Sequence, residues 1–352
     1  MNENTTTTKK TSWLNKLNPL GIIRGSSGIL TTVFALLIMI VVQGVVLGFN
    51  TGSFTAVFPK LLSSWLNILR NNTYTGVIAL GMCLIIVSGG IDLSVGSMTC
   101  AVGAVLMFLL DESVGFLARF GIKGILAYVI GIVIALAVGF IFGEINGLLV
   151  AYGRIPPFIV TLGTMKIFRS VTQQCTRQFN PVVPNGFKKI ASFRIGGEII
   201  LPIIYWAVVI VIMHILFKRT AFGKKVVAVG SNEKAARYSG INVNAVKRRV
   251  YVISGIMCAI AAIIYVARIG SMDFANAGSG YEMDSVAAVV VGGTAMSGGK
   301  GSIIGAFLGM LIIGTMNSVL NMLGVPTFLC DAVRGAIIIF AVLVQRRGKV
   351  TE

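Results

Sequence analysis

Charged side chains are scarce in this chain. Of its 352 residues only 12% are Asp, Glu, Lys or Arg, whereas 55% are hydrophobic. A soluble globular protein carries roughly 25% charged residues, so the composition excludes a water-soluble enzyme, a disordered protein and a nucleic-acid-binding domain. Histidine is represented by His214 alone. Without a His-x-x-x-His pair, a metal cluster or a nucleophile–base pair, a membrane enzyme is also disfavoured.

A cysteine framework and a secretory signal are also missing. The five cysteines form no Cys-x-x-Cys pair, and four lie within or beside apolar runs, where Cys behaves as a small hydrophobe. We therefore predict neither a disulfide framework nor a metal site. Residues 1–28 are polar and basic, and no small-residue cleavage site follows the first apolar run. We expect a cytoplasmic N-terminal extension there rather than a signal peptide.

Long apolar runs are abundant. A helix needs about 20 apolar residues to cross the hydrocarbon core, and the chain holds enough for roughly ten such helices. This predicts an all-α polytopic membrane protein, with a transmembrane domain over residues 29–345 and a cytoplasmic tail over 346–352. The expected spans lie at 29–49, 74–88, 95–110, 124–151, 157–176, 199–217, 249–268, 284–297, 302–323 and 327–344.

The basic residues cluster between the apolar runs. With the N-terminus in the cytoplasm, the inner segments hold 18 of the 30 Lys and Arg residues and the outer loops hold 8. Because cytoplasmic loops carry an excess of Lys and Arg, both termini are expected in the cytoplasm. The net charge of +18 then reflects membrane topology, and we expect no nucleic-acid partner.

The second and third spans form one apolar run over residues 74–110. A single helix of that length would measure about 55 Å, whereas the hydrocarbon core is about 30 Å thick. The run must therefore fold back, and the glycines of residues 88–97 permit the turn. Asp92 and Ser94 can accept hydrogen bonds from backbone N–H groups exposed there. Asp92 is the only ionisable residue of the run, and a carboxylate at membrane depth usually faces a cavity or a partner.

A second glycine-rich break, of similar composition, covers residues 291–302 and also separates two apolar runs. Paired Gly-interrupted segments in the two halves of a transporter point toward its substrate path. The alternative is that each break is a tight loop between spans that contributes only geometry. Our topology places both breaks on the cytoplasmic side.

Other polar residues occur inside the spans. Thr161 and Thr164 allow close packing in the fifth span and could also bind a polar solute. Lys166 and Arg169 in the same span predict that it faces protein or water rather than lipid. Near the inner end of the fourth span, Glu144 and Asn146 could hydrogen-bond a solute, or each other and a neighbouring helix.

Two further features have structural interpretations. Apolar residues at helical spacing over 54–69 predict an amphipathic helix that lies at the membrane interface. Asp331 and Arg334, three residues apart in the last span, are expected to form an internal ion pair.

The longest internal polar segment covers residues 218–249. Within it, Ser231 or Asn232 can cap a helix, Glu233 suits its first turn, and Gly240 suits its end. We predict a helix of about two turns whose alanine side chains would let the groove of a partner approach closely. The alternative is an exposed loop that serves only topology.

Six motifs of the chain are Ser88–Gly96, Gly143–Gly147, Pro157–Thr164, Phe222–Gly240, Met283–Gly299 and Gly335–Val342. Through these motifs the chain resembles the membrane-spanning permeases of bacterial ABC importers for monosaccharides, the ribose, arabinose, xylose and galactoside group. The resemblance covers about residues 30–345. Within the group it is greatest to the galactose/methyl-galactoside branch, through residues 157–165 and 334–342. Lys166 and the N-terminal extension depart from the pattern.

The resemblance implies a permease domain over 29–345 in the bacterial inner membrane, with 218–249 as its coupling loop. It implies two cytoplasmic ATP-binding subunits, a periplasmic or lipid-anchored sugar-binding protein, and a second permease copy that makes a homodimer or a heterodimer. ATP and Mg would be used by the partner subunit, and this chain would bind no cofactor or metal. The helix that docks on the ATPase would comprise Glu233, Ala235, Ala236 and Gly240.

The leading hypothesis is conduction of a galactose-like monosaccharide by a non-catalytic membrane subunit. A neutral sugar needs hydroxyl, amide and aromatic groups along its path. The Gly-Lys pairs at 223–224 and 299–300 lack the remaining residues of a phosphate loop. One alternative is an ion-coupled secondary transporter of a small polar solute, and another is an ABC permease for a nucleoside or a signalling furanose. The candidate path residues are Asp92, Ser94, Asn146, Thr161 and Thr164.

Overall fold

The computed structural model describes residues 28–52, 57–113, 115–177, 181–195, 197–326, 329–337 and 339. The tail over 346–352 and nearly all of the expected N-terminal extension lie outside these residues, as do residues 327, 328, 338 and 340–344 of the last predicted span. Residues 329–337 are helical. The elements are α2 (Gly28–Thr51), α3 (Val57–Asn71), α4 (Thr73–Val87), α5 (Val95–Leu110), α6 (Phe116–Arg119), α7 (Gly124–Ala151), α8 (Pro157–Thr176), α9 (Asn185–Ser192), β1 (Arg194–Ile195), β2 (Glu198–Ile199), α10 (Leu201–Arg219), α11 (Ala221–Ser231), α12 (Glu233–Tyr238), α13 (Val243–Ile269), α14 (Tyr281–Val291) and α15 (Ile303–Met322).

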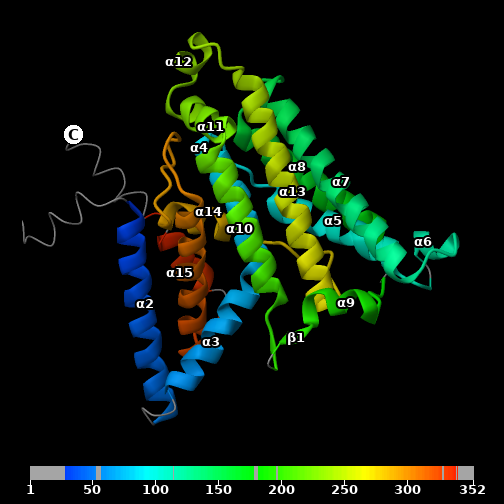
Figure 1. The fold of residues 1–352 in the computed structure, drawn as a ribbon, viewed down its shortest axis with the longest axis vertical. Helices are drawn as coiled ribbons and strands as arrows, with labels where there is room; N and C mark the ends of the chain where they lie inside the picture. The colour runs from blue at the N-terminus through cyan, green and yellow to red at the C-terminus, as the bar shows by residue number, and fades with distance from the viewer. Residues whose placement is uncertain are drawn as a thin grey trace, which may run out of the picture.

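The predicted all-α polytopic fold is confirmed. Five helices, namely α2, α7, α10, α13 and α15, are long and apolar enough to cross a membrane, and α4 and α5 are shorter apolar helices. The only strands in the described residues are β1 and β2, a two-stranded antiparallel hairpin. In Figure 1 the long helices lie side by side, with α11 and α12 at one end of the bundle and α3, α9 and β1 at the other. We call these the α12 end and the α3 end.

Helix α13 lies at the centre of the bundle and packs against α7, α4, α5 and α9. Small residues let α13 and α7 approach closely, as is usual where membrane helices pack. A Cβ atom added at Gly255 of α13 would lie only 2.2 Å from the carbonyl oxygen of Gly139 in α7. The backbones of the two longest helices are therefore in contact, and α4, α5 and α9 pack against this pair through α13.

The predicted fold-back of residues 74–110 is confirmed. The chain just before α4 lies at the C-terminal part of α13, where the Arg268 guanidinium donates to the Arg70 carbonyl at 3.1 Å. The end of α4 lies near the N-terminal part of α13, since the Tyr251 hydroxyl donates to the Ile91 carbonyl at 3.1 Å. Helix α5 then returns, because a Cβ at Gly103 would again meet side chains from the C-terminal part of α13 and the residues after it.

The second glycine-rich break also reverses the chain. Helix α14 ends at Val291, residues 292–301 form a non-helical connection, and Ser302 caps α15 by accepting a hydrogen bond from the Gly305 N–H at 3.2 Å. Helices α14 and α15 pack against each other, and a Cβ at Gly292 would lie 2.2 Å from the Gly305 carbonyl oxygen. Glycine is needed at this position because the two backbones leave no space for a side chain.

Helix α3 is more than an interfacial anchor. The predicted apolar stripe begins at Phe54, which lies outside the described residues. Two members of the stripe, Phe58 and Leu62, are exposed. The opposite edge is part of the bundle, since Ile68 is buried and Trp65 and Leu69 pack against the core. The helix therefore packs against α15 and α2, and its Ser64 side chain accepts a hydrogen bond from Gln43 of α2.

Candidate functional site

The first glycine-rich break places a polar cluster inside the bundle. The Asp92 Oδ1 atom accepts hydrogen bonds from the Ser94 backbone N–H at 2.8 Å and from the Ser94 hydroxyl at 2.6 Å. The Asn146 Nδ2 group of α7 donates to the same hydroxyl oxygen at 2.8 Å. All three side chains have no solvent exposure. Three of the five candidate path residues, far apart in the sequence, therefore meet in one network.

Two acceptor atoms of this cluster have no donor. Within the described residues, neither Asp92 Oδ2 nor Asn146 Oδ1 has a hydrogen-bonding partner. Buried polar atoms are nearly always paired, with protein or with water. The two oxygens can therefore accept hydroxyl groups from a solute or from water that enters the bundle.

Thr161 and Thr164 are buried but do not join this cluster. Their hydroxyls donate along their own helix α8, Thr161 to the Pro157 carbonyl at 2.9 Å and Thr164 to the Val160 carbonyl at 3.1 Å. Backbone bonding of this kind leaves each oxygen with acceptor capacity only. The structure thus separates these two candidates from the other three.

Glu144 is held by an ion pair rather than by Asn146. Its Oε1 atom lies 2.6 Å from the Arg248 guanidinium of α13. The Arg169 guanidinium of α8 donates to the Ala277 carbonyl at 2.6 Å, so this cation faces protein, as predicted, whereas Lys166 is exposed. The ion pair of Glu144 and the hydrogen bond of Arg169 lower the cost of placing these two charges within the bundle.

Sequence reasoning missed the segment from Gly270 to Gly280. Arg169 holds it against α8, and its Gly278 meets the first turn of α5, where a Cβ at Gly96 would lie 2.0 Å from the Gly278 carbonyl oxygen. The same Cβ would lie 2.8 Å from Glu282 Oε2 in the first turn of α14. Helix α14 therefore begins beside the start of α5. The available signal in the sequence was the set of glycines at 270, 278 and 280, which adopt positive φ in the structure.

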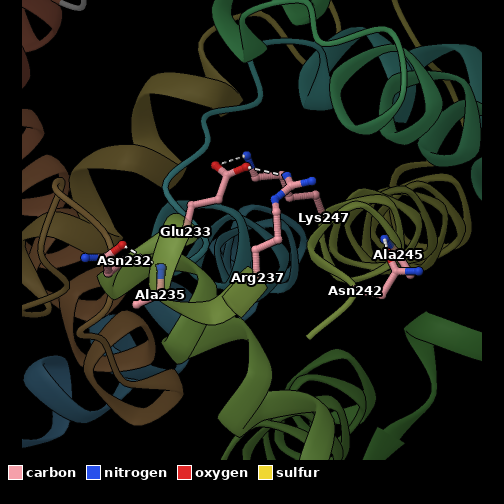
Figure 2. A network of polar contacts seen from close by, with 7 residues as sticks. All are labelled: Asn232, Glu233, Ala235, Arg237, Asn242, Ala245 and Lys247. Atoms are coloured by element: carbon pink, nitrogen blue, oxygen red, sulfur yellow. Dashed lines mark hydrogen bonds and ion pairs between the residues drawn. The ribbon is translucent and has the colours of Figure 1, made fainter. Parts of the chain in front are cut away.

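The helix predicted in the polar loop is present as α12. Asn232 caps it by accepting a hydrogen bond from the Ala235 N–H at 3.0 Å, and Gly240 follows it with φ of 77°. Glu233 pairs with Lys247 at 2.7 Å and with Arg237 at 3.3 Å. Figure 2 shows these contacts joining α12 to the start of α13. The hydrogen bond from Lys247 is the main cause that lowers the pKa of Glu233.

The four residues expected on the docking surface do not share one face. Glu233, Ala235 and Gly240 are exposed, but Ala236 is buried and packs against the core of the bundle. Tyr238, which sequence reasoning did not select, is 90% exposed at the end of the helix. An aromatic side chain left this open on a capped helix is a feature of protein interfaces.

Helix α11, which leads directly into α12, touches both glycine-rich breaks. The Gly299 N–H of the second break donates at 2.9 Å to the carbonyl of Val87, the residue directly before the first break. A Cβ at Gly230 of α11 would lie 1.7 Å from that carbonyl oxygen and 2.8 Å from the Gly299 nitrogen. In Figure 1 the loop between α14 and α15 accordingly lies beside α11. We call this meeting point of Gly230, Val87 and Gly299 the corner.

Residues 64–342 match the family described as the permease component of the branched-chain amino acid transport system. The chain belongs to this family. The ribose import permease of Bacillus subtilis is 40% identical over 80% of this chain and 84% of its own length. That of Escherichia coli K12 is 38% identical over 81% and 86%.

The galactose/methyl galactoside import permease of Escherichia coli K12 is also similar, at 35% identity over 78% of this chain and 84% of its own length. No solved structure matches the chain significantly. The predicted relationship to the monosaccharide ABC importer permeases is confirmed by these relatives. Membership of the galactose branch is not confirmed, because the ribose permeases share a higher sequence identity with this chain than the galactose permease does.

Proposed function

We propose that this chain is the membrane-spanning subunit of an ATP-driven importer that conducts a monosaccharide, with ATP hydrolysed by separate subunits. One observation carries the proposal. A capped, exposed helix, α12, continues from α11, which touches both glycine-rich breaks of the bundle. Force applied to α12 by a partner would therefore reach the segment that holds Asp92.

A neutral sugar suits the buried cluster. Hydroxyl groups can donate to Asp92 Oδ2 and Asn146 Oδ1, which lack donors in the described residues. The galactose prediction stays open beside ribose, which is the substrate named for several relatives. A nucleoside or a signalling furanose would present the same kind of hydroxyl groups.

The proposed partners follow from the two ends of the bundle. Cytoplasmic ATPase subunits would bind the α12 end, because residues 218–249 carry nine of the Lys and Arg residues and such loops face the cytoplasm. Both termini would then lie in the cytoplasm. A periplasmic or lipid-anchored binding protein would deliver sugar at the α3 end, and a second permease copy would complete the path in the bacterial inner membrane.

An ion-coupled transporter has less support from the structure. Glu144 is paired with Arg248 and Asp331 is paired with Arg334. Asp92 and Glu282, which form no ion pair among the described residues, remain as candidates for proton coupling. An ion-coupled mechanism predicts that a protonophore abolishes uptake while ATP is held constant, whereas our proposal predicts that it does not.

The test is reconstitution of the chain with its ATPase and binding protein in vesicles. We expect labelled D-galactose or D-ribose to accumulate only with ATP and only in the complete complex. Glu233→Lys should abolish uptake without loss of membrane insertion, because it opposes Lys247 and Arg237 with a third cation. Glu233→Gln serves as the control for the loss of negative charge alone. Accumulation against a gradient by the isolated chain would refute the proposal.

A further inference from the structure

A polar groove lies between α3 and α15 at the α3 end of the bundle. Its walls are two matched stripes, Ser64, Asn67 and Asn71 on α3 and Asn317, Ser318 and Asn321 on α15. Each stripe has the spacing of one helix face. Together with residues at the start of α4 and with Arg334 they line a cavity of about 570 Å³. We call this cavity the amide groove; none of its residues belongs to the predicted path.

A hydrogen-bonded link joins the two walls of the groove. The Gln43 amide of α2 donates to the Ser64 hydroxyl at 2.8 Å and to the Ser318 hydroxyl at 3.3 Å. Polar residues between membrane helices commonly act as such links. Beyond this link, no hydrogen bond between the described side chains joins an asparagine of α3 to one of α15, so the facing amides border open space.

Arginines fix how several of these amides point. Arg70 donates to the side-chain oxygen of Asn67, Arg268 to that of Asn71, and Arg334 to that of Asn317 at 3.2 Å. Because an arginine can only donate, each carbonyl oxygen is engaged. Within the described residues the three NH₂ groups make no hydrogen bond, so the groove offers pre-oriented donors to a ligand.

The charge of the groove favours a neutral ligand. Arg334 is its only charged lining residue. Its guanidinium lies 3.0 Å from Asp331 and 3.3 Å from Asp284, so its charge is already compensated. A free anion or cation would find no unpaired counter-charge among the lining residues, whereas hydroxyl groups would find both donors and acceptors.

The groove also has a rigid apolar wall. Tyr74 contributes to the lining, stacks on Tyr281 with ring centroids 5.5 Å apart and meets the edge of Tyr265 at 5.3 Å. Ligand sites combine apolar and aromatic walls with a few oriented polar groups, and their volumes run from about 300 to 1,000 Å³. The C–H face of a sugar ring can pack on such a wall while its hydroxyl groups meet the amides.

We propose that the amide groove binds a neutral monosaccharide at the α3 end before the sugar reaches the Asp92 cluster. The proposal rests on the proposed function for its choice of ligand. A line of contacts leads inward from the groove. Tyr74 stacks on Tyr281, and the neighbouring Glu282 lies against Gly96 at the start of α5, two residues from Ser94.

Cysteine protection tests the groove directly. In the complete complex with Cys175, the exposed native thiol, replaced by Ser, Asn321→Cys is labelled by a membrane-impermeant maleimide. Within the described residues the Asn321 side chain makes no hydrogen bond, so the substitution spares the fold. Asn185→Cys on the exposed surface of α9 is the matched control. D-galactose, D-ribose and potassium glutamate are the competing solutes.

We expect one of the sugars to slow labelling at position 321 by at least threefold, with no effect at position 185 and none from glutamate. In uptake assays Asn67→Leu combined with Asn321→Leu should raise the half-saturating sugar concentration by about 3- to 10-fold for each hydrogen bond lost, whereas Asn185→Leu should leave it unchanged. Equal protection at both positions, or protection at neither, would refute the proposal that the amide groove binds sugar.

The two proposals can fail separately. If the wild-type complex accumulates sugar but no sugar protects position 321, the importer stands and the amide groove is refuted. If the complex accumulates neither sugar but a sugar still protects position 321 selectively, the groove stands and the proposed transport function is refuted.

Discussion

Replacement of Gly230 by alanine should break the corner where α11 meets the two glycine-rich breaks. The added Cβ would lie 1.7 Å from the Val87 carbonyl oxygen and 2.8 Å from the Gly299 nitrogen. These two atoms form a 2.9 Å hydrogen bond, so the added methyl group would clash with both the acceptor and the donor of that bond. Both contacting atoms belong to backbone, which cannot turn away as a side chain can.

The size of the effect follows from the distances. Ordinary contact begins at 3.4 Å, so α11 and Val87 must separate by about 1.7 Å, the difference between 3.4 and 1.7. Overpacking of this kind costs about 1–3 kcal/mol, and loss of the hydrogen bond adds about 1 kcal/mol. Alanine recovers up to about 1 kcal/mol in helix propensity. We expect Gly230→Ala to lower the free energy of unfolding by about 2 kcal/mol.

The assay compares unfolding, ATP hydrolysis and uptake in the complete complex. Thermal unfolding, followed by a dye that reacts with newly exposed cysteines, measures stability. We expect sugar uptake to fall more than ATP hydrolysis, because α12 stays exposed for docking while the link to the breaks is disturbed. Gly163→Ala on α8 is the control, since a Cβ there meets nothing within 4 Å. Unchanged stability and uptake in Gly230→Ala would refute the importance of the corner.

Three further predictions concern other parts of the chain. Asp92→Ala should lower the free energy of unfolding by about 1–3 kcal/mol, measured by thermal unfolding, because it leaves the Ser94 N–H and hydroxyl unpaired. Asp92→Asn keeps an acceptor and should lower the free energy of unfolding by less. Equal losses in the two variants would contradict this prediction. Gly255→Ala should lose about 1–3 kcal/mol in the same assay, since its Cβ would meet backbone of α7 at 2.2 Å, and a neutral result would show that the helices can part freely. Because the pKa of Glu233 is lowered by Lys247, its pairing should hold above the unfolded carboxyl pKa of about 4.3 and be lost as the pH falls through the lower folded value. Hydrogen exchange of α12 should then rise only at the acid end, and the same rise in Glu233→Gln would exclude this cause.

Much of the fold could be predicted from the sequence. Apolar runs must match the thickness of the hydrocarbon core, so the limits of α7 and α8 coincide with the predicted spans, and the run over 74–110 had to reverse. Capping residues act on backbone groups a few positions away, which is why Asn232 and Gly240 located α12 correctly. Helix α14 was placed less well, because it starts at Tyr281 inside the bundle rather than at a membrane surface.

The site was predictable in part. Asp92 and Ser94 are neighbours in the chain, and their hydrogen bonds follow from the local turn. The addition of Asn146 and the exclusion of Thr161 depend on how α7 and α8 are rotated about their axes. Sequence periodicity gave no signal for that rotation, because both helices carry apolar residues around much of their circumference.

Hydrophobic length, glycine breaks and helix caps, all properties of short stretches of chain, determined that this is an all-α membrane protein with a capped polar helix. Only the tertiary structure decided that the two breaks touch at Gly230, that Ala236 turns inward, and that α3 and α15 face each other with amides across an open groove. These relations join residues that are distant in sequence. They depend on which helix faces meet, and that is set by packing of the whole bundle rather than by any local preference of the chain.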